Sequence, residues 1–274
     1  MEMNESADYG NWVPVVMMKM LWCVTLAAAA VSVLLFALLS SRIPGIVMIV
    51  VTLYSLCMTL YMQRCRYLFD FKGGGLMGEF HQFLIDNFPW NESRRQAGVS
   101  DGKGVILDIG CGAAALTNRV AKTFPNASVT GVDFWGAEWS YAKEQCERNA
   151  KIEGLSNRVF FQKGDAANLD FKDGAFDGVV SNFVFHEVRS AANKREVVKE
   201  ALRVLKKGGA FAFQDMFEQK AVYGDMQEFV AWLKSSGTVS EIHYIPNIEN
   251  QNFVSKFITA PWMIKNAGLV YGIK

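Results

Sequence analysis

The chain has 274 residues, with 28 Lys and Arg residues against 27 Asp and Glu residues. This length accommodates one large domain or two small ones. The balanced charge argues against a nucleic-acid partner, which usually requires a basic surface. The five cysteines form no Cys-x-x-Cys pair and no metal-ligand pattern, so we expect reduced thiols in a cytosol-facing protein and no metal site.

Two long apolar runs lie near the N-terminus. An acidic arm, residues 1–20, precedes residues 21–41 and 43–63, and neither run contains a charged residue. Each run is about 20 residues, which is the length of a helix that crosses the bilayer core. We therefore expect a transmembrane helical hairpin over residues 21–63. A cleaved signal peptide is disfavoured because the start is acidic, and a buried soluble hairpin is the other alternative.

The basic residues around the hairpin predict its orientation. Arg64, Arg66 and Lys72 follow the second run, whereas the connecting loop carries only Arg42. The positive-inside rule then places the C-terminal bulk of the chain in the cytoplasm. Because two spans return the chain to the side on which it started, the N-terminus is expected there too.

Residues 64–102 form a connector. Three glycines at 73–75 precede apolar residues at helical spacing that end at Pro89. This amphipathic helix either roofs a ligand site or packs on the neighbouring domain or the membrane.

From residue 103 onward, strand and helix patterns alternate, which is typical of a doubly wound α/β fold with a mostly parallel sheet. We expect strands at 104–109, 127–132, 158–162, 176–182 and 210–215, with late strands near 239–245 and 268–273. We expect helices at 114–123, 138–152, 192–205 and 222–235, and a helix stop at 206–209.

A glycine turn and three acidic residues follow the first three strands. The turn, Gly110-Cys111-Gly112, joins a buried strand to a helix, as in nucleotide-binding sites. Asp108, Asp133 and Asp165 fall at strand ends, which face one crevice in such a sheet. A carboxylate beside the turn disfavours a diphosphate and suits a cationic ligand group.

These segments together resemble the class I S-adenosylmethionine-dependent methyltransferases, and the branch most similar includes quinone-biosynthesis enzymes that act on small molecules. The resemblance covers about residues 103–274, and it is carried by 107–112, 131–133, 164–166, 176–182 and 202–209. It implies a Rossmann-like fold with a seven-stranded sheet whose last strand is antiparallel. Ala114 stands where the family commonly has a third glycine, and we expect a slightly tighter turn that keeps its binding function.

The resemblance also implies roles by position for S-adenosylmethionine. The methionine part is assigned to Asp108 and the glycines of the turn, and the ribose to Asp133. Phe134 would pack near the adenine, Asp165 and Ala166 would read its edge, and Asn182 would lie beside the cofactor at the fourth strand end. The complete set of implied cofactor-binding residues is Asp108, Gly110, Cys111, Gly112, Asp133, Phe134, Asp165, Ala166 and Asn182.

Candidate catalytic residues lie at the expected mouth of the crevice. His186 is the first candidate for a base or an acceptor-orienting group, with Glu187 beside it and Asp215 at the fifth strand end. For each, hydrogen bonding within a loop or capping a turn is the alternative. His81 and Tyr67 are weaker candidates, and His243 reads as a strand residue.

The favoured hypothesis is a membrane-anchored methyltransferase, residues 103–274, acting on a small, lipophilic acceptor. The alternatives are a dinucleotide-dependent oxidoreductase and a non-catalytic membrane scaffold that retains the fold. Residues 248–267 either shape the acceptor pocket or belong to the core. The acceptor, the atom methylated and the oligomeric state are left open by the sequence.

Overall fold

The computed structural model describes residues 5–136, 142–260 and 262–274. The chain divides into two compact units: one is Gly10–Gly78, and the other joins the residues up to Tyr9 with Glu79–Lys274. The second unit therefore takes in the beginning of the N-terminal arm and most of the connector. We describe each unit separately.

The smaller unit is a pair of long helices, α1 (Val15–Leu38) and α2 (Ile43–Phe69). Their mean hydropathies over the most apolar stretch are 2.4 and 2.1, so both are long and apolar enough to cross a membrane. Relative to the uncharged runs, α1 starts earlier, so that it includes Lys19, and ends earlier, at Leu38, whereas α2 continues past residue 63 and includes Arg66. Pro44 occupies the first turn of α2, where proline is tolerated.

Hydroxyl groups hold the two helices together. The Thr25 hydroxyl lies 2.7 Å from that of Ser55 and 3.0 Å from that of Thr59, and Ser32 lies 3.2 Å from Thr52. Because these polar residues are small, the two backbones can approach closely, and the hydroxyl groups serve as hydrogen-bond partners for one another. Most large apolar side chains, including Val33 and Leu38 at 68% and 76% exposure, point outward instead.

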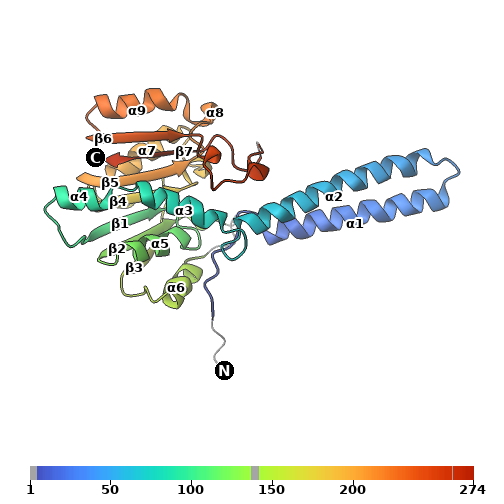
Figure 1. Ribbon diagram of the computed structural model, residues 1–274, viewed down its shortest axis with the longest axis horizontal. Coiled ribbons are helices and arrows are strands. Elements are labelled where there is room, and N and C mark those ends of the chain that lie inside the picture. The colour runs from blue at the N-terminus through green and yellow to red at the C-terminus, as the bar shows by residue number, and fades with distance from the viewer. Residues whose placement is uncertain (1–4, 137–141, 261) are drawn as a thin grey trace. The chain divides into compact units, whose positions relative to one another are not determined.

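The larger unit is built on one seven-stranded sheet in the order β3-β2-β1-β4-β5-β7-β6 (Figure 1). The strands pair in parallel except β7, which runs antiparallel to both β5 and β6. The predicted fold and its antiparallel last strand are thus confirmed. The strands are β1 (Gly104–Ile109), β2 (Ala127–Asp133), β3 (Val159–Lys163), β4 (Phe176–Asn182), β5 (Leu205–Asp215), β6 (Glu241–Pro246) and β7 (Gly268–Ile273).

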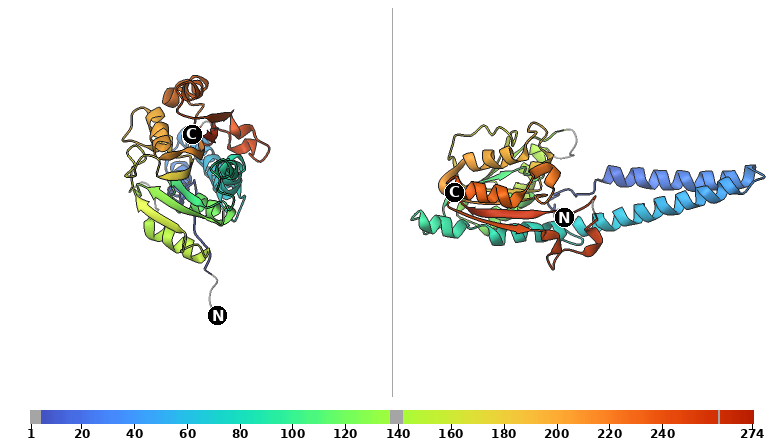
Figure 2. Two further views of the ribbon diagram at one scale, coloured as in Figure 1. Left: turned by 90° about the vertical axis from the view of Figure 1, so that its left-hand side faces the viewer. Right: turned by 90° about the horizontal axis from the view of Figure 1, so that it is seen from above.

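Helices cover both sides of this sheet (Figure 2). Side chains of α7 and α9 share one core with the sheet residues Leu107, Val179 and Phe213. On the opposite face, a Cβ on Gly178 would meet the rings of Phe88 and Trp90, so this glycine admits the segment joining α3 to α4. The helices are α3 (Leu76–Asn87), α4 (Trp90–Gln96), α5 (Ala115–Thr123), α6 (Lys143–Ile152), α7 (Lys194–Arg203), α8 (Lys220–Tyr223) and α9 (Met226–Ser235).

Three predicted elements differ from the structure. The expected helix stop at 206–209 lies inside β5, which pairs with β4 at Leu205, is irregular over the next residues and resumes at Ala210. The single helix over 222–235 is two, because Gly224 adopts a φ of 67° and Asp225 caps α9. Of the expected helix 138–152, α6 accounts for 143–152, and residues 138–141 lie outside the described part of the chain.

A buried carboxylate, Asp177, ties four elements together. It accepts from the Val105 backbone N–H at 2.9 Å, and it pairs with Arg94 of α4 at 3.0 Å and with Lys206 of β5 at 2.8 Å. The Asp177 and Arg94 side chains are only 10% and 8% exposed. Although burial opposes its charge, these three donors lower the pKa of Asp177.

We predict that Asp177→Ala costs about 3–5 kcal/mol of folding free energy, because it leaves the buried Arg94 without its carboxylate. The measurement is urea unfolding of the detergent-solubilised chain. Asp173→Ala is the matched control: Asp173 pairs with Arg203 at 2.6 Å but is 83% exposed, and its loss should cost less than about 1 kcal/mol. Equal effects of the two changes would contradict this assignment.

Candidate active site

The glycine turn between β1 and α5 is a series of left-handed residues. Gly110, Gly112 and Ala114 have φ of 75°, 54° and 70°. For alanine this conformation costs about 1–2 kcal/mol. The turn therefore holds alanine in a conformation that glycine adopts without this cost, and the slightly tighter turn stays a prediction. Ala114 is fully buried, and its carbonyl accepts from the Asn118 N–H of α5 at 3.0 Å.

Backbone and side-chain groups fix the turn from behind. The N–H groups of Gly110 and Cys111 both donate to the Val132 carbonyl of β2, at 2.7 and 3.1 Å. Cys111 is 6% exposed and packs against Gly131, where a Cβ would lie 2.9 Å from its Sγ. The Gly112 carbonyl accepts from the indole N–H of Trp135 at 3.0 Å. Nothing in the local sequence pointed to Trp135.

Asp108 lies below this turn and is 1% exposed. Its Oδ2 accepts from the Thr117 hydroxyl of α5 at 2.6 Å. Burial raises the pKa of Asp108 to about 7, with the nearby Asp133 carboxylate adding to the rise and the Thr117 hydroxyl opposing it. The carboxyl group is thus poised to ionise when a cation approaches.

Asp133, at the end of β2, is half-buried and already orders the turn. Its two carboxylate oxygens accept from the backbone N–H groups of Gly112 and Trp135 at 2.9 and 2.8 Å. A carboxylate has about four acceptor positions, so two remain for ligand hydroxyls. Phe134 is 62% exposed, with the Lys163 ammonium 5.3 Å from its ring centre.

Asp165 follows β3 and is half-buried. Its Oδ1 accepts from the Ala167 N–H at 2.9 Å and from the Ser190 hydroxyl at 2.8 Å. Ala166, which lies between Asp165 and Ala167 in the chain, packs against the hydrophobic core. Within the described residues, Asp108, Asp133 and Asp165 all lie at the carboxyl edge of the first three strands, as the sequence predicts.

At the end of β4, Asn182 is oriented by a neighbour that sequence reasoning missed. The Gln214 Nε2 group of β5 donates to the Asn182 Oδ1 at 2.8 Å, across a parallel register that places the two side by side. The next residue, Phe183, stacks edge-on against Phe80 of α3 with ring centres 5.5 Å apart. Helix α3 therefore does reach the strand edge where the candidate site lies.

His186 and Asp215, predicted separately, are brought into direct contact. The His186 Nδ1 lies 2.6 Å from the Asp215 Oδ1, and its Nε2 lies 3.4 Å from Glu187. Burial opposes the imidazolium, but Asp215 and Glu187 together raise the pKa of His186 to about 10. At neutral pH the ring is therefore a cationic hydrogen-bond donor, and not the free base that its sequence position suggests.

The buried Tyr223 of α8 also faces Asp215. Burial and the charge of Asp215 raise the pKa of Tyr223 far above its usual range, so it stays protonated. Its ring packs on Phe217 with centres 4.9 Å apart. The sequence pattern placed Tyr223 in a helix over 222–235 and gave no sign that it faces Asp215, so Tyr223 was not a candidate.

The weaker candidates differ in burial and in their partners. His81 is 4% exposed and burial lowers its pKa to about 3, which leaves it neutral. His243 lies on edge strand β6 and pairs with Glu241 at 2.6 Å. Tyr67 belongs to the other unit, near the end of α2.

Residues 248–267 are divided between core and surface. Ile258 and Ile264 are fully buried, whereas Phe253 packs edge-on against Phe80 with ring centres 5.3 Å apart. Trp262 is 63% exposed, and Pro261 lies outside the described residues. Part of this segment therefore belongs to the core, and its role in shaping an acceptor pocket stays a prediction.

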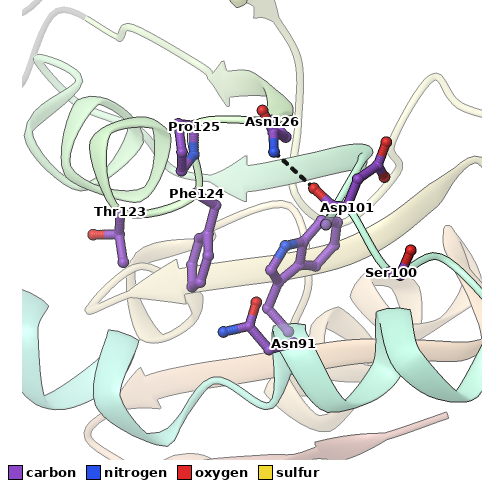
Figure 3. Close-up of a pocket in the computed structure, with 9 residues that line it drawn as sticks. Asn91, Ser100, Asp101, Thr123, Phe124, Pro125 and Asn126 are labelled. Atoms are coloured by element: carbon purple, nitrogen blue, oxygen red, sulfur yellow. Dashed lines mark hydrogen bonds between the residues drawn. The ribbon is translucent and has the colours of Figure 1, made fainter.

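A pocket of about 220 Å³ lies at the opposite ends of the strands, where β1 and β2 begin (Figure 3). It is lined by Trp90 and Phe124 and by the residues just before β1 and β2, where the Asn126 amide donates to the Asp101 carbonyl at 2.7 Å. This pocket faces away from the strand-end acids and is not the candidate site. Among the described residues, no group of His, Cys, Asp and Glu is arranged to hold a metal ion.

Comparison with known proteins identifies the type of domain that carries the candidate site. Residues 107–213 match the methyltransferase domain family. They form an S-adenosylmethionine-dependent methyltransferase domain. The match begins at the strand before the glycine turn and ends near the close of β5, so it includes the three acids and His186. It gives no support to the dinucleotide-dependent oxidoreductase.

Several curated methyltransferases are similar to this part of the chain. A sterol 24-C-methyltransferase of Aspergillus fumigatus is 34% identical over 133 residues, which cover 48% of this chain and 33% of that protein. An arsenite methyltransferase of Aquipseudomonas alcaligenes is 31% identical over 127 residues, covering 45% and 36%. The chain spans about a third of the length of these relatives. A solved methyltransferase of Methanosarcina mazei is 22% identical over 62% of this chain and 91% of its own, with a TM-score of 0.46.

The polar groups at the strand ends of the methyltransferase domain fit S-adenosylmethionine. The ligand has a diol, a purine edge and an ammonium group at its amino-acid end. The site has acceptor oxygens at three strand ends and a buried carboxyl group that a nearby cation would ionise. A metal is not needed to complete this set.

The raised pKa of His186 makes a testable contribution to stability. Because the folded-state pKa of about 10 lies above the usual 6.5, this contribution is complete below pH 6.5 and is lost as the pH rises through 10. We predict that the melting temperature of the wild type falls more steeply between pH 7 and 10 than that of His186→Gln. Parallel curves for the two proteins would contradict the ionised His186–Asp215 pair.

Proposed function

We propose that this protein is a membrane-anchored methyltransferase that transfers a methyl group from S-adenosylmethionine to a small, lipophilic acceptor. The observation that carries the proposal is the convergence of Asp108, Asp133 and Asp165 on one sheet edge, around a turn held in its left-handed form. This arrangement recognises both ends of the cofactor at once.

The roles proposed for these residues follow from the hydrogen-bond acceptor positions that each still has unused. Asp133 would hold the ribose diol with its two unused acceptor positions, and Asp165 would accept from the adenine amino group beside the exposed Phe134. Asp108 would balance the cationic amino-acid end. Asn182, fixed by Gln214, would present its amide to the transferring group.

S-adenosylmethionine supplies an electrophilic methyl group when bound, so the protein mainly has to align the acceptor and exclude water. His186, kept protonated by Asp215, would orient the acceptor by donating from Nε2. Glu187, half-exposed and with its pKa lowered by His186, is the ionised carboxylate nearby that can receive an acceptor proton.

Three features support a lipophilic acceptor and a membrane location. The outward faces of α1 and α2 are apolar and need a lipid-like cover. The rings of Phe80, Phe183 and Phe253 gather beside Asn182, where an acceptor would approach. Relatives that share this domain are named for sterols.

The chain on both sides of the hairpin contributes to the larger unit, since the residues up to Tyr9 join Glu79–Lys274. This supports a two-span anchor with both ends on one side of the membrane. Together with Arg64, Arg66 and Lys72, it favours a methyltransferase domain that faces the cytoplasm.

The test of activity is transfer of tritiated methyl groups from S-adenosylmethionine by the full chain in nanodiscs, offered fractionated lipid and water-soluble extracts. We expect label in an organic-phase product, identified by mass spectrometry. Asp133→Ala should abolish labelling and weaken S-adenosylhomocysteine binding about 100-fold, since two charge-assisted hydrogen bonds are lost. Asp170→Ala, an exposed acid nearby, is the control and should behave as the wild type.

Two results would overturn parts of the proposal. Binding without labelled product in any extract favours the scaffold. Label confined to water-soluble products rules out the lipophilic acceptor while leaving the methyltransferase activity in place.

Protonation of Asp108 provides a separate prediction. Because its pKa is about 7 in the free protein and a nearby ammonium would lower it, S-adenosylhomocysteine binding should release about half a proton at pH 7 and nearly one at pH 6. Calorimetry in buffers of different ionisation enthalpy measures this release, and Asp108→Asn should eliminate it. Proton uptake on binding would place the cationic group elsewhere.

A further inference from the structure

Two residues of the N-terminal arm, Asp8 and Tyr9, dock on the methyltransferase domain, and we call them the strap. The Asp8 backbone N–H donates to the Asn149 Oδ1 of α6 at 3.0 Å. In return, the Asp8 carbonyl accepts from the Asn149 Nδ2 at 2.6 Å and from the Gln145 Nε2 at 2.7 Å. Asp8 is thus held through its main chain, by two side-chain amides of α6.

The second residue of the strap joins α5 to α6. The Tyr9 hydroxyl donates to the Glu153 Oε1 just after α6, at 3.0 Å, and accepts from the Asn118 Nδ2 of α5 at 3.2 Å. Asn118 and Asn149 are 1% and 0% exposed. The strap thus supplies hydrogen-bond partners for the buried Asn118 Nδ2 group and for both polar atoms of the Asn149 amide.

Asn149 also reaches the glycine turn. Its Nδ2 group donates to the Ala113 carbonyl at 2.9 Å, in addition to its bond with the strap. One α6 turn earlier, the Cys146 thiol contacts the Gly112 carbonyl at 3.0 Å. Two successive carbonyls of the turn are therefore held by α6, and the second is held by the residue that the strap orients.

This contact bears on the strained residue of the turn. The Ala113 carbonyl belongs to the peptide group that precedes Ala114, and the orientation of that peptide sets the φ of 70° at Ala114. Strained residues persist only where surrounding contacts over-determine them. The bond from Asn149 is such a contact at the position where a glycine would need none.

We propose that Asn149 is a positioning residue for the cofactor turn and that the strap keeps it in place, so that cofactor affinity depends on the docked N-terminal arm. The proposal rests on the proposed function for the identity of the cofactor. Since the unit that contains α1 begins at Gly10, the residue after the strap, the chain that leads to the anchor also orders the turn.

The test uses the full chain in nanodiscs, titrated with S-adenosylhomocysteine. Asp8→Pro removes the N–H that donates to Asn149, and Asn149→Ala removes the bridge itself. We expect each to raise the Kd about tenfold, as the loss of one buried hydrogen bond would. Asp8→Ala is the matched control: its side chain takes no part in the bonds to Asn149 and Gln145, so its Kd should stay within about twofold of the wild type.

A rescue separates positioning from a general structural role. In an Ala114→Gly background the left-handed residue needs no support, so Asp8→Pro should then weaken binding by no more than about threefold. An undiminished tenfold loss in that background would overturn the positioning role. So would wild-type affinity for Asp8→Pro in the Ala114 protein.

Hydrogen exchange provides a readout that needs no ligand. The Ala114 and Asn118 N–H groups bond to the Cys111 and Ala114 carbonyls at 2.7 and 3.0 Å, and they should exchange faster in Asp8→Pro but not in Asp8→Ala. Unchanged exchange of these two N–H groups in Asp8→Pro would overturn the proposal that the strap orders the turn. If the wild type fails to bind S-adenosylhomocysteine while exchange responds as expected, the proposed function fails and the strap stands.

Discussion

The left-handed turn from Gly110 to Ala114 is the constraint on which the rest of the larger unit depends. A chain that leaves a buried strand and enters a helix within a few residues must reverse direction through backbone angles that most residues avoid. The turn is held by the Val132 carbonyl, by the Asp133 carboxylate and by contacts from α6. Because the third left-handed position is alanine, these contacts offset a strain that glycine would not have.

Charge is distributed around that turn in two contrasting ways. Asp108 is buried with one hydroxyl donor, so its ionised form is costly until a cation arrives. His186, in contrast, is buried against a carboxylate and holds its proton well above neutral pH. The same fold therefore keeps a half-protonated acid and a charged base at the carboxyl ends of its parallel strands at pH 7, an arrangement that suits the proposed binding of a cationic cofactor and orientation of an acceptor.

The two units, the hairpin and the methyltransferase domain, differ in where they place polar and apolar side chains. Within α1 and α2 the polar hydroxyls turn toward each other and the large apolar side chains point outward, whereas the sheet buries its apolar residues on both faces. The strap belongs to the second environment although its residues precede the first. The strap and the first apolar helix therefore belong to one continuous segment of the chain.

Much of this was determined by the sequence alone: the order of strands and helices, the acids at three strand ends and the two apolar helices all follow from residue periodicity and turn chemistry, which are local. The split of α8 from α9, the inclusion of 206–209 in β5 and the partners of the site did not follow. Trp135, Gln214 and Asn149 reach their targets only after distant segments are packed together. Tertiary structure alone decided that His186 is protonated, since its pKa depends on Asp215, 29 residues away in the chain, and on burial.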